Sequence, residues 1–129
     1  MISVERWRVV LIDFDPKFGP EQAGIRPALI VSRDPFHRSG MATVCPISAR
    51  APKYPAEVAI PAGHAGQSLE TSILCHQLRT IDLRRVTALE IGGQQQVVTD
   101  PVIRAAVRRA LARQLGLDLT DALDGAAWV

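Results

Sequence analysis

The chain has 129 residues, of which 47% are hydrophobic, and its 15 basic and 13 acidic side chains give a formal net charge of +2. This size fits one globular domain, and no stretch approaches the roughly 20 apolar residues that are needed to cross a bilayer. Cys45 and Cys75 lie inside apolar runs without CxxC spacing, which predicts reduced, buried thiols of a cytoplasmic protein and argues against a zinc site.

Positive charge dominates the first nine-tenths of the chain. Three of the 13 acids are Asp118, Asp121 and Asp124, so residues 1–117 hold 15 basic and 10 acidic side chains. Thirteen of the 15 bases are arginine, whose planar guanidinium binds phosphate in a bidentate manner and stacks on bases. This excess is compatible with nucleic-acid binding and equally compatible with a solvated, Arg-rich surface.

Three apolar runs in the first half of the chain predict β-strands. They occupy residues 8–14, 26–32 and 41–48. Residues 15–24, between the first two runs, contain four prolines and glycines and predict a long irregular loop. Residues 34–40 predict a turn between the second and third strands.

The second and third predicted strands direct two polar side chains toward the same end of a sheet. In a hairpin centred near His37, antiparallel partners have residue numbers that sum to about 74 or 75. Arg26 then falls opposite Ser48. A guanidinium and a hydroxyl at a barrel rim suit cleavage of RNA by its 2′-hydroxyl, which passes through a negatively charged phosphorane. Alternatively, Arg26 is a surface ion-pair residue and Ser48 caps a turn.

The second half of the chain predicts further short strands and one helix. Residues 57–60 predict a strand, and residues 72–81 predict one more strand or two strands with a kink. Asp100 is the expected N-cap of the helix, Pro101 suits its first turn, and Gly116 is expected to end it.

The predicted helix has an apolar face and a basic remainder. The residues expected on the buried face are Ile103, Ala106, Val107, Ala110, Leu111 and Leu115. The arginines expected elsewhere on its surface are Arg104, Arg108, Arg109 and Arg113. This basic surface either binds acidic partners or is merely solvated. Short strands followed by one helix predict an α+β fold with a small closed sheet over residues 1–117, followed by a poorly ordered tail at residues 118–129.

Four sequence blocks resemble those of MazF/PemK toxins, in the same order and at similar spacing. Residues 13–32 (DFDPKFGPEQAGIRPALIVS) resemble the first hairpin of that family, including its pattern E-Q-x-G-x-R-P. Residues 43–50 (TVCPISAR), 54–58 (YPAEV) and 75–82 (CHQLRTID) resemble the three sequence blocks that follow this hairpin in the family. On these blocks the chain is identified as a member of the family, whose members are toxins of type II toxin–antitoxin systems.

The resemblance implies a fold, an activity and partners. The implied fold is a small SH3-like β-barrel with a C-terminal α-helix, assembled as a homodimer. The implied activity is that of a metal-independent endoribonuclease, an mRNA interferase without a cofactor, which cuts single-stranded RNA sequence-selectively to leave 2′,3′-cyclic phosphate and 5′-hydroxyl ends. The implied inhibitor is a cognate MazE-like antitoxin whose acidic-hydrophobic C-terminal segment occupies the RNA groove. No membrane partner is expected.

The resemblance also assigns roles to individual residues. Arg26 matches the catalytic arginine of the family, and Ser48 matches its catalytic threonine while keeping the hydroxyl. The positions expected to bind RNA are Glu21, Gln22, Arg50, Gln77 and Arg79.

His76 is the most informative departure from the family pattern, because many members have a carboxylate there. Alternation along a strand predicts that His76 points to the opposite side from Cys75 and Gln77. Its imidazole is expected to take the proton of the 2′-hydroxyl, to stack on an RNA base, or to be a partly buried structural histidine. Trp7 and Arg8 also depart from the family, which usually has Gly-Asp at the start of the first strand.

Two other functions are compatible with the sequence. A gyrase-directed toxin of the CcdB kind shares the barrel and has a tryptophan near its C-terminus, as Trp128 is here, but the E-Q-x-G-x-R-P block is foreign to it. The other is a homologue of the family that binds without full catalytic activity. It is compatible with the sequence because residues at the expected site depart from the family pattern. An RNA-cleavage assay in EDTA beside a gyrase supercoiling assay separates these possibilities.

Overall fold

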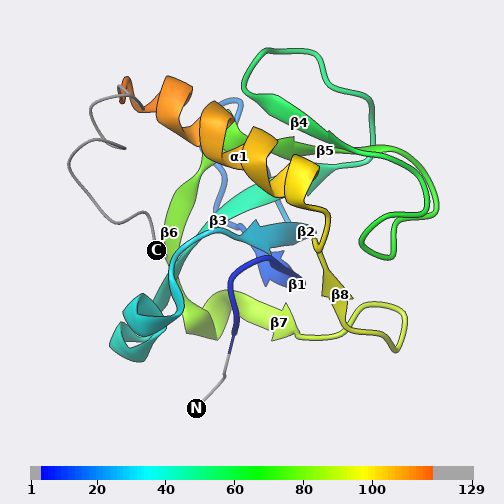
Figure 1. The fold of residues 1–129 in the computed structure, drawn as a ribbon. Coiled ribbons are helices and arrows are strands. Elements are labelled where there is room, and N and C mark those ends of the chain that lie inside the picture. Colours follow the sequence, from blue (N-terminus) through cyan, green and yellow to red (C-terminus); the bar gives the residue numbers. More distant parts are fainter. Residues whose placement is uncertain (1–3, 118–129) are drawn as a thin grey trace.

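The computed structural model describes residues 4–117, and the tail predicted at residues 118–129 lies outside them. Eight strands in this range form a curled antiparallel sheet, and helix α1 (Pro101–Gln114) lies across one of its faces (Figure 1). The predicted α+β class, a small curled barrel with a C-terminal helix, is confirmed. No helix among the described residues has the length and apolar character needed to span a membrane.

The strands are mostly short. They are β1 (Arg8–Asp13), β2 (Ile25–Ile30), β3 (Met41–Ser48), β4 (Glu57–Ile60), β5 (Thr71–Leu74), β6 (Arg79–Asp82), β7 (Val86–Ala88) and β8 (Gln96–Val97). Three 3₁₀ turns accompany them, namely η1 (Asp34–Ser39), η2 (Cys75–Gln77) and η3 (Leu83–Arg85). The sheet order is β4-β5-β3-β2-β1-β7, with β6 added to β3 and β8 added to β1. The sequence analysis missed β7 and β8.

Both faces of the sheet are covered. Val9 and Val10, adjacent in β1, are each fully buried but belong to different apolar clusters, as the alternation of a strand requires. The cluster containing Val9 also includes Trp7 and the inner face of α1. The cluster containing Val10 lies on the opposite face of the sheet and includes Phe14 at the end of β1. Because both faces of β1 are buried, its sequence is a nearly continuous apolar run rather than an alternation of apolar and polar residues.

The predicted register between β2 and β3 is confirmed, but the paired ladder ends before it reaches Arg26 and Ser48. Ala28 pairs with Pro46, and their residue numbers add up to 74, as the predicted register requires. The ladder stops there because the next pair, Pro27 with Ile47, needs a hydrogen bond from the backbone N–H of residue 27, and a proline has none. On the other edge of β2, Arg26 pairs with Ile12 of β1, and on the other edge of β3, Ser48 pairs with Ser72 of β5.

The segment predicted as one strand or as two strands with a kink is two strands. Ile47 pairs with Ile73 of β5, and Val44 pairs with Arg79 of β6, so both strands lie along the same edge of β3. The 3₁₀ turn η2 separates them. The residues of η2 are thereby placed outside the hydrogen-bonded ladder.

Helix α1 begins and ends as predicted, within two residues. The Asp100 carboxylate accepts a hydrogen bond from the Val102 N–H (2.8 Å), and Gly116 has a φ of +67° just beyond the last turn. Leu115 was expected on the buried face and is 57% exposed, because the helix ends at Gln114 and Leu115 leaves its periodicity. Ala112 is buried instead.

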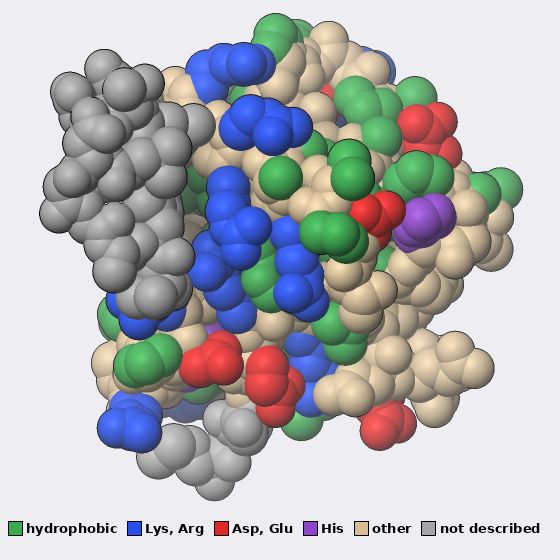
Figure 2. Space-filling view, in the orientation of Figure 1, with side chains coloured by type: hydrophobic (Ala, Val, Ile, Leu, Met, Phe, Trp, Pro, Cys, Tyr) green, Lys and Arg blue, Asp and Glu red, His purple; other side chains and the backbone are tan. Residues whose placement is uncertain are grey.

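The remaining face of α1 is basic. It carries four arginines and no acid, and Figure 2 shows Lys and Arg side chains gathered on the side of the molecule that α1 crosses. This agrees with the predicted placement of the arginines away from the buried face.

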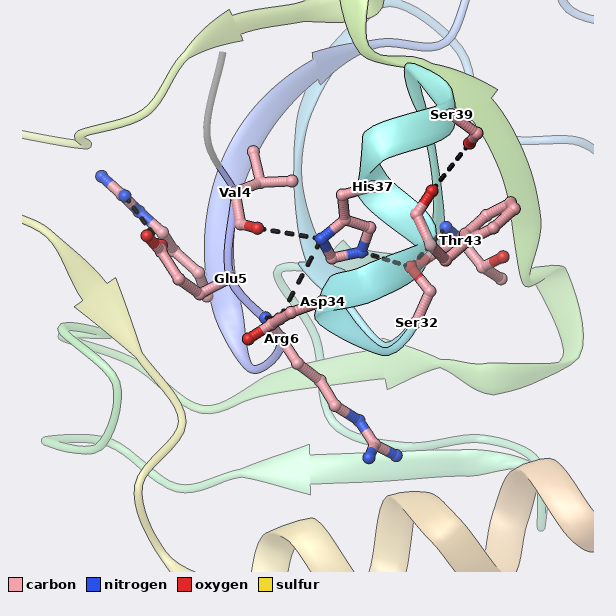
Figure 3. A network of polar contacts seen from close by, with 10 residues as sticks. Val4, Glu5, Arg6, Ser32, Asp34, His37, Ser39 and Thr43 are labelled. Atoms are coloured by element: carbon pink, nitrogen blue, oxygen red, sulfur yellow. Dashed lines mark hydrogen bonds and ion pairs between the residues drawn. The ribbon is translucent and has the colours of Figure 1, made fainter. Parts of the chain in front are cut away.

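The segment predicted as a turn around His37 is the 3₁₀ turn η1, and His37 is buried. Its Nδ1 lies 2.9 Å from the Val4 carbonyl, and its Nε2 lies 2.7 Å from the Ser32 hydroxyl (Figure 3). Because a carbonyl can only accept, Nδ1 carries the hydrogen and Nε2 accepts from Ser32. The imidazole thus ties the N-terminal segment to the β2–β3 connection.

Candidate active site

A cleft of about 680 Å³ opens between the β1–β2 loop, the β3–β4 connection and η2. Six of the eight predicted site residues line it: Glu21, Gln22, Arg50, His76, Gln77 and Arg79. The lining residues that sequence reasoning missed are Phe14, Pro20, Pro46, Tyr54 and Leu78. Segments more than 50 residues apart in the sequence therefore meet at one site.

The β1–β2 loop is held in place by its own polar groups and by η2. The Gln22 N–H donates to Oε1 of Gln77 (3.1 Å), which joins the loop to the turn. The Phe18 N–H donates to Oε1 of Glu21 (2.8 Å), so this predicted RNA-binding carboxylate is engaged within its own loop. The Gly24 N–H donates to Oδ1 of Asp15 (2.9 Å) where the loop returns to β2.

Arg50 is fixed by a buried carboxylate that the sequence analysis did not single out. Nη1 and Nη2 of Arg50 donate to the two oxygens of Glu57 at 2.7 and 2.6 Å. This bidentate hydrogen bond is the main cause that lowers the pKa of Glu57 to about 2, against the opposing effect of burial, and it raises the pKa of Arg50. Arg50 therefore faces the cleft with a fixed orientation and a compensated charge.

His76 and Tyr54 form an aromatic corner of the cleft. Their ring centroids are 5.7 Å apart in an edge-to-face arrangement, and Tyr54 is 59% exposed. The predicted alternation around His76 is wrong, because residues 75–77 form a 3₁₀ turn rather than a strand. Both His76 and Gln77 line the cleft, whereas Cys75 is buried. Nδ1 of His76 is buried and has no hydrogen-bond partner among the described residues.

Arg79 supplies uncompensated charge to the cleft. Its Nη1 donates to the Phe14 carbonyl (3.3 Å), and it forms no ion pair within residues 4–117. A guanidinium in this state can bind a phosphate group. No group of three or more His, Cys, Asp or Glu side chains gathers to hold a metal in that part of the chain.

Arg26 and Ser48 do not line the cleft. Ala28 pairs with Pro46, and residues two apart in a strand share a face, so Arg26 and Ser48 lie on the same face of the sheet as Pro46. Pro46 is itself part of the lining. Nε of Arg26 donates to the Ala23 carbonyl (2.9 Å). The catalytic roles of Arg26 and Ser48 stay predictions.

The fold is that of MazF proteins, as two solved structures show. A crystal structure of MazF from Deinococcus radiodurans superposes with a TM-score of 0.74 at 31% identity, covering 91% of this chain and 100% of that one. A crystal structure of MazE-MazF from the same organism gives a TM-score of 0.69 at 29% identity, covering 92% and 100%.

Sequence comparison gives the family. Residues 5–115 match the model of the family described as PemK-like, MazF-like toxin of type II toxin-antitoxin system, and the chain belongs to this family. The protein named Endoribonuclease EndoA from Bacillus subtilis is 39% identical over 87 residues, which are 65% of this chain and 75% of that protein. The family predicted from the four sequence blocks is therefore confirmed.

Proposed function

We propose that this protein is the toxin of a type II toxin–antitoxin system and an endoribonuclease that cuts single-stranded RNA at the cleft. The observation that carries the proposal is the meeting of Arg79, Arg50, Gln77 and His76 in one cleft of a MazF-like fold. Guanidinium, amide and imidazole groups are those that bind phosphates and the edges and faces of unpaired bases. The activity named for the 39% identical relative supports the same assignment.

The proposed reaction is an internal transesterification. The 2′-oxygen of the RNA forms a bond to phosphorus, the bond from phosphorus to the 5′-oxygen breaks, and the products carry a 2′,3′-cyclic phosphate and a 5′-hydroxyl. Arg26 stabilises the negative charge that the phosphorane gains, and the Ser48 hydroxyl donates to a phosphorane oxygen or to the leaving 5′-oxygen. His76 accepts the proton of the 2′-hydroxyl, a task for which an always-charged arginine is poorly suited. The leaving 5′-oxygen takes a proton from water, and the protonated imidazole returns its own proton to solvent, so no net proton is gained or lost.

The remaining roles concern binding. Arg79 contacts a phosphate, Tyr54 stacks on an unpaired base, and the side-chain amides of Gln22 and Gln77 contact base edges. The protein acts as a homodimer in the cytoplasm and is inhibited by a MazE-like antitoxin with an acidic-hydrophobic C-terminal segment. The buried thiols of Cys45 and Cys75 fit a reducing compartment.

Cleavage of single-stranded RNA in EDTA tests the function and the three catalytic roles together. We expect the wild type to cut, Arg26→Ala to lose activity, and Ser48→Ala to be slower by roughly 10²-fold, the usual effect of losing one transition-state donor. His76→Asn loses most of the rate if the imidazole is the base, whereas His76→Phe retains it if the ring only stacks. Circular dichroism and gel filtration control for fold and assembly.

A second function is favoured by one observation, the position of Arg26 and Ser48 outside the cleft lining. A homologue that binds RNA without cutting it has no need of these groups at the scissile phosphate. Full cleavage activity in Arg26→Ala contradicts the catalytic assignment. Binding of RNA without cleavage by the wild type favours the second function, and inhibition of gyrase supercoiling favours a gyrase-directed toxin.

A further inference from the structure

A group of arginines surrounds Trp7 beneath α1. The indole is 5% exposed, and the Cζ atoms of Arg6, Arg104 and Arg108 lie 4.8, 5.3 and 5.2 Å from its ring centroid. Arg6 belongs to the N-terminal segment, whereas Arg104 and Arg108 lie one turn apart on α1. Together with Arg33, which lies close enough to influence Arg6, they form what we call the arginine cluster.

The arginine cluster carries excess positive charge. None of its four members forms an ion pair within the described chain. Asp34 lies near Arg6, but its Oδ1 accepts from the backbone N–H of Arg6 (2.8 Å) rather than from its guanidinium. Figure 3 shows the Arg6 side chain extending away from His37 and Asp34. Burial and the neighbouring Arg108, Arg33 and Arg104 lower the pKa of Arg6.

Two details indicate that an anion is the missing partner. The terminal nitrogens of Arg6, unlike its buried Nε, are accessible, and they donate no hydrogen bond within the described residues. Attraction between each guanidinium and the indole holds the cations close to one another although they repel. A phosphate binds such a group well, because its oxygens can each accept from a different planar guanidinium.

We propose that the arginine cluster binds backbone phosphates of single-stranded RNA outside the cleft. This inference rests on the proposed function and adds a second contact site for RNA that extends beyond the cleft. No member of the arginine cluster lines the cleft. Because the indole is buried, its face is not available to a base, so the contacts are independent of sequence. For the same reason the cluster offers little apolar surface to an acidic-hydrophobic peptide.

A pair of matched double variants tests the proposal in the full chain. Arg6→Gln with Arg108→Gln removes two guanidiniums whose side chains donate no hydrogen bond within the described residues, so no protein acceptor loses its partner. Arg109→Gln with Arg113→Gln removes the same charge from exposed positions on the same helix. The probe is a 2′-O-methyl oligoribonucleotide several times longer than the cleft, which cannot be cut because its 2′-oxygen is blocked.

We expect the first double variant to bind this probe about tenfold more weakly than the wild type in fluorescence anisotropy. The slope of log K against log salt should become less negative by about 1.4, as for two lost phosphate contacts on a single strand. The control double variant should lose less than about threefold. A short RNA that fills only the cleft should be cleaved by the first variant with the kcat/KM of the wild type.

Three results overturn the proposal. They are unchanged probe affinity in Arg6→Gln with Arg108→Gln, an equal loss in the control variant, and an equal loss of kcat/KM on the short RNA. Failure of the proposed function is a separate observation, namely that the wild type cuts no RNA. The uncleavable probe still reports on the arginine cluster in that case, because its binding does not depend on cleavage.

Discussion

The carboxylate of Glu57 orients the Arg50 guanidinium at the wall of the cleft. Glu57 accepts two hydrogen bonds from Arg50 and a third from the Lys53 N–H (2.6 Å), and it is 6% exposed. A fourth comes from the Tyr54 N–H (3.3 Å), and a buried carboxylate with four donors is strongly favoured in its charged form. Removing its charge therefore affects both the stability of the fold and the direction of Arg50.

Glu57→Gln should lower the free energy of unfolding at neutral pH by about 2 kcal/mol. The pKa of Glu57 is about 2 in the folded protein and 4.5 ordinarily, so its contribution is complete above pH 4.5 and lost as pH falls toward 2. The wild type and the variant should therefore converge in stability over this range. Urea unfolding at a series of pH values measures the difference.

A matched control for this prediction is Asp82→Asn, which breaks the exposed ion pair with Arg84. Screening by solvent makes such a pair weak, so its loss should change stability little at neutral pH. A Glu57→Gln effect that is as large at pH 2 as at pH 7 contradicts the proposed electrostatic origin.

At the scale of elements, the cleft depends on contact between the β1–β2 loop and η2. A single hydrogen bond, from the Gln22 N–H to Oε1 of Gln77, joins backbone and side chain across 55 residues of sequence. The amide of Gln77 thus supports the loop that carries Glu21, in addition to its proposed contact with RNA.

Gln77→Ala should increase amide hydrogen exchange in residues 18–24 and raise KM for RNA several-fold, because the loop loses its anchor. Gln67→Ala is the control, since Gln67 donates to Oε1 of Gln96 (2.8 Å) and neither residue lines the cleft. Hydrogen exchange followed by mass spectrometry separates the two roles of Gln77. A raised KM with unchanged exchange would mean that Gln77 contacts RNA without supporting the loop.

The elements that sequence reasoning predicted are those with long or well-marked patterns. β1, β2 and β3 are six to eight residues long and mostly apolar, and α1 has an N-cap and a terminal glycine. β7 and β8 have three and two residues, too few for any periodicity, and they are strands only because β1 pairs with them. The break at η2 was compatible with the sequence but not specified by it.

The site was predictable in part, and mostly from the family blocks. Residue pattern alone gave the register that relates Arg26 to Ser48, but it did not foresee that the ladder ends before this pair, where Pro27 has no N–H to donate. Tyr54 was missed, although an aromatic residue next to a proline in a polar connection was a usable signal. The arginines around Trp7 could not be predicted, because their proximity depends on where α1 packs.

At the scale of the whole molecule, positive charge is found at two separate places, the cleft and the arginine cluster. The proposed antitoxin segment, which is acidic and apolar, matches the cleft better, because Tyr54, Phe14 and Pro46 supply apolar surface beside Arg79. The arginine cluster offers charge almost alone. The two sites are therefore expected to respond differently to the antitoxin.

We expect the antitoxin to prevent cleavage of a short RNA by occupying the cleft, with an affinity that falls as salt rises because part of the attraction is screened charge. Competition against a labelled short RNA, with the Arg26→Ala variant that we expect not to cut, measures this directly. Isothermal titration at several salt concentrations gives the dependence. A complex that still cuts short RNA at saturating antitoxin contradicts occlusion of the cleft.

The turn η2 has a consequence for how this toxin can change in evolution. Five residues, 74–78, stand opposite only Cys45 and Pro46 on β3, so three of them are additional to the ladder. Substitutions in this segment, for example at Leu78, therefore alter the lining of the cleft while the pairings of β5 and β6 stay in register. A lineage can acquire a new RNA target through a few such changes without first having to restabilise its scaffold.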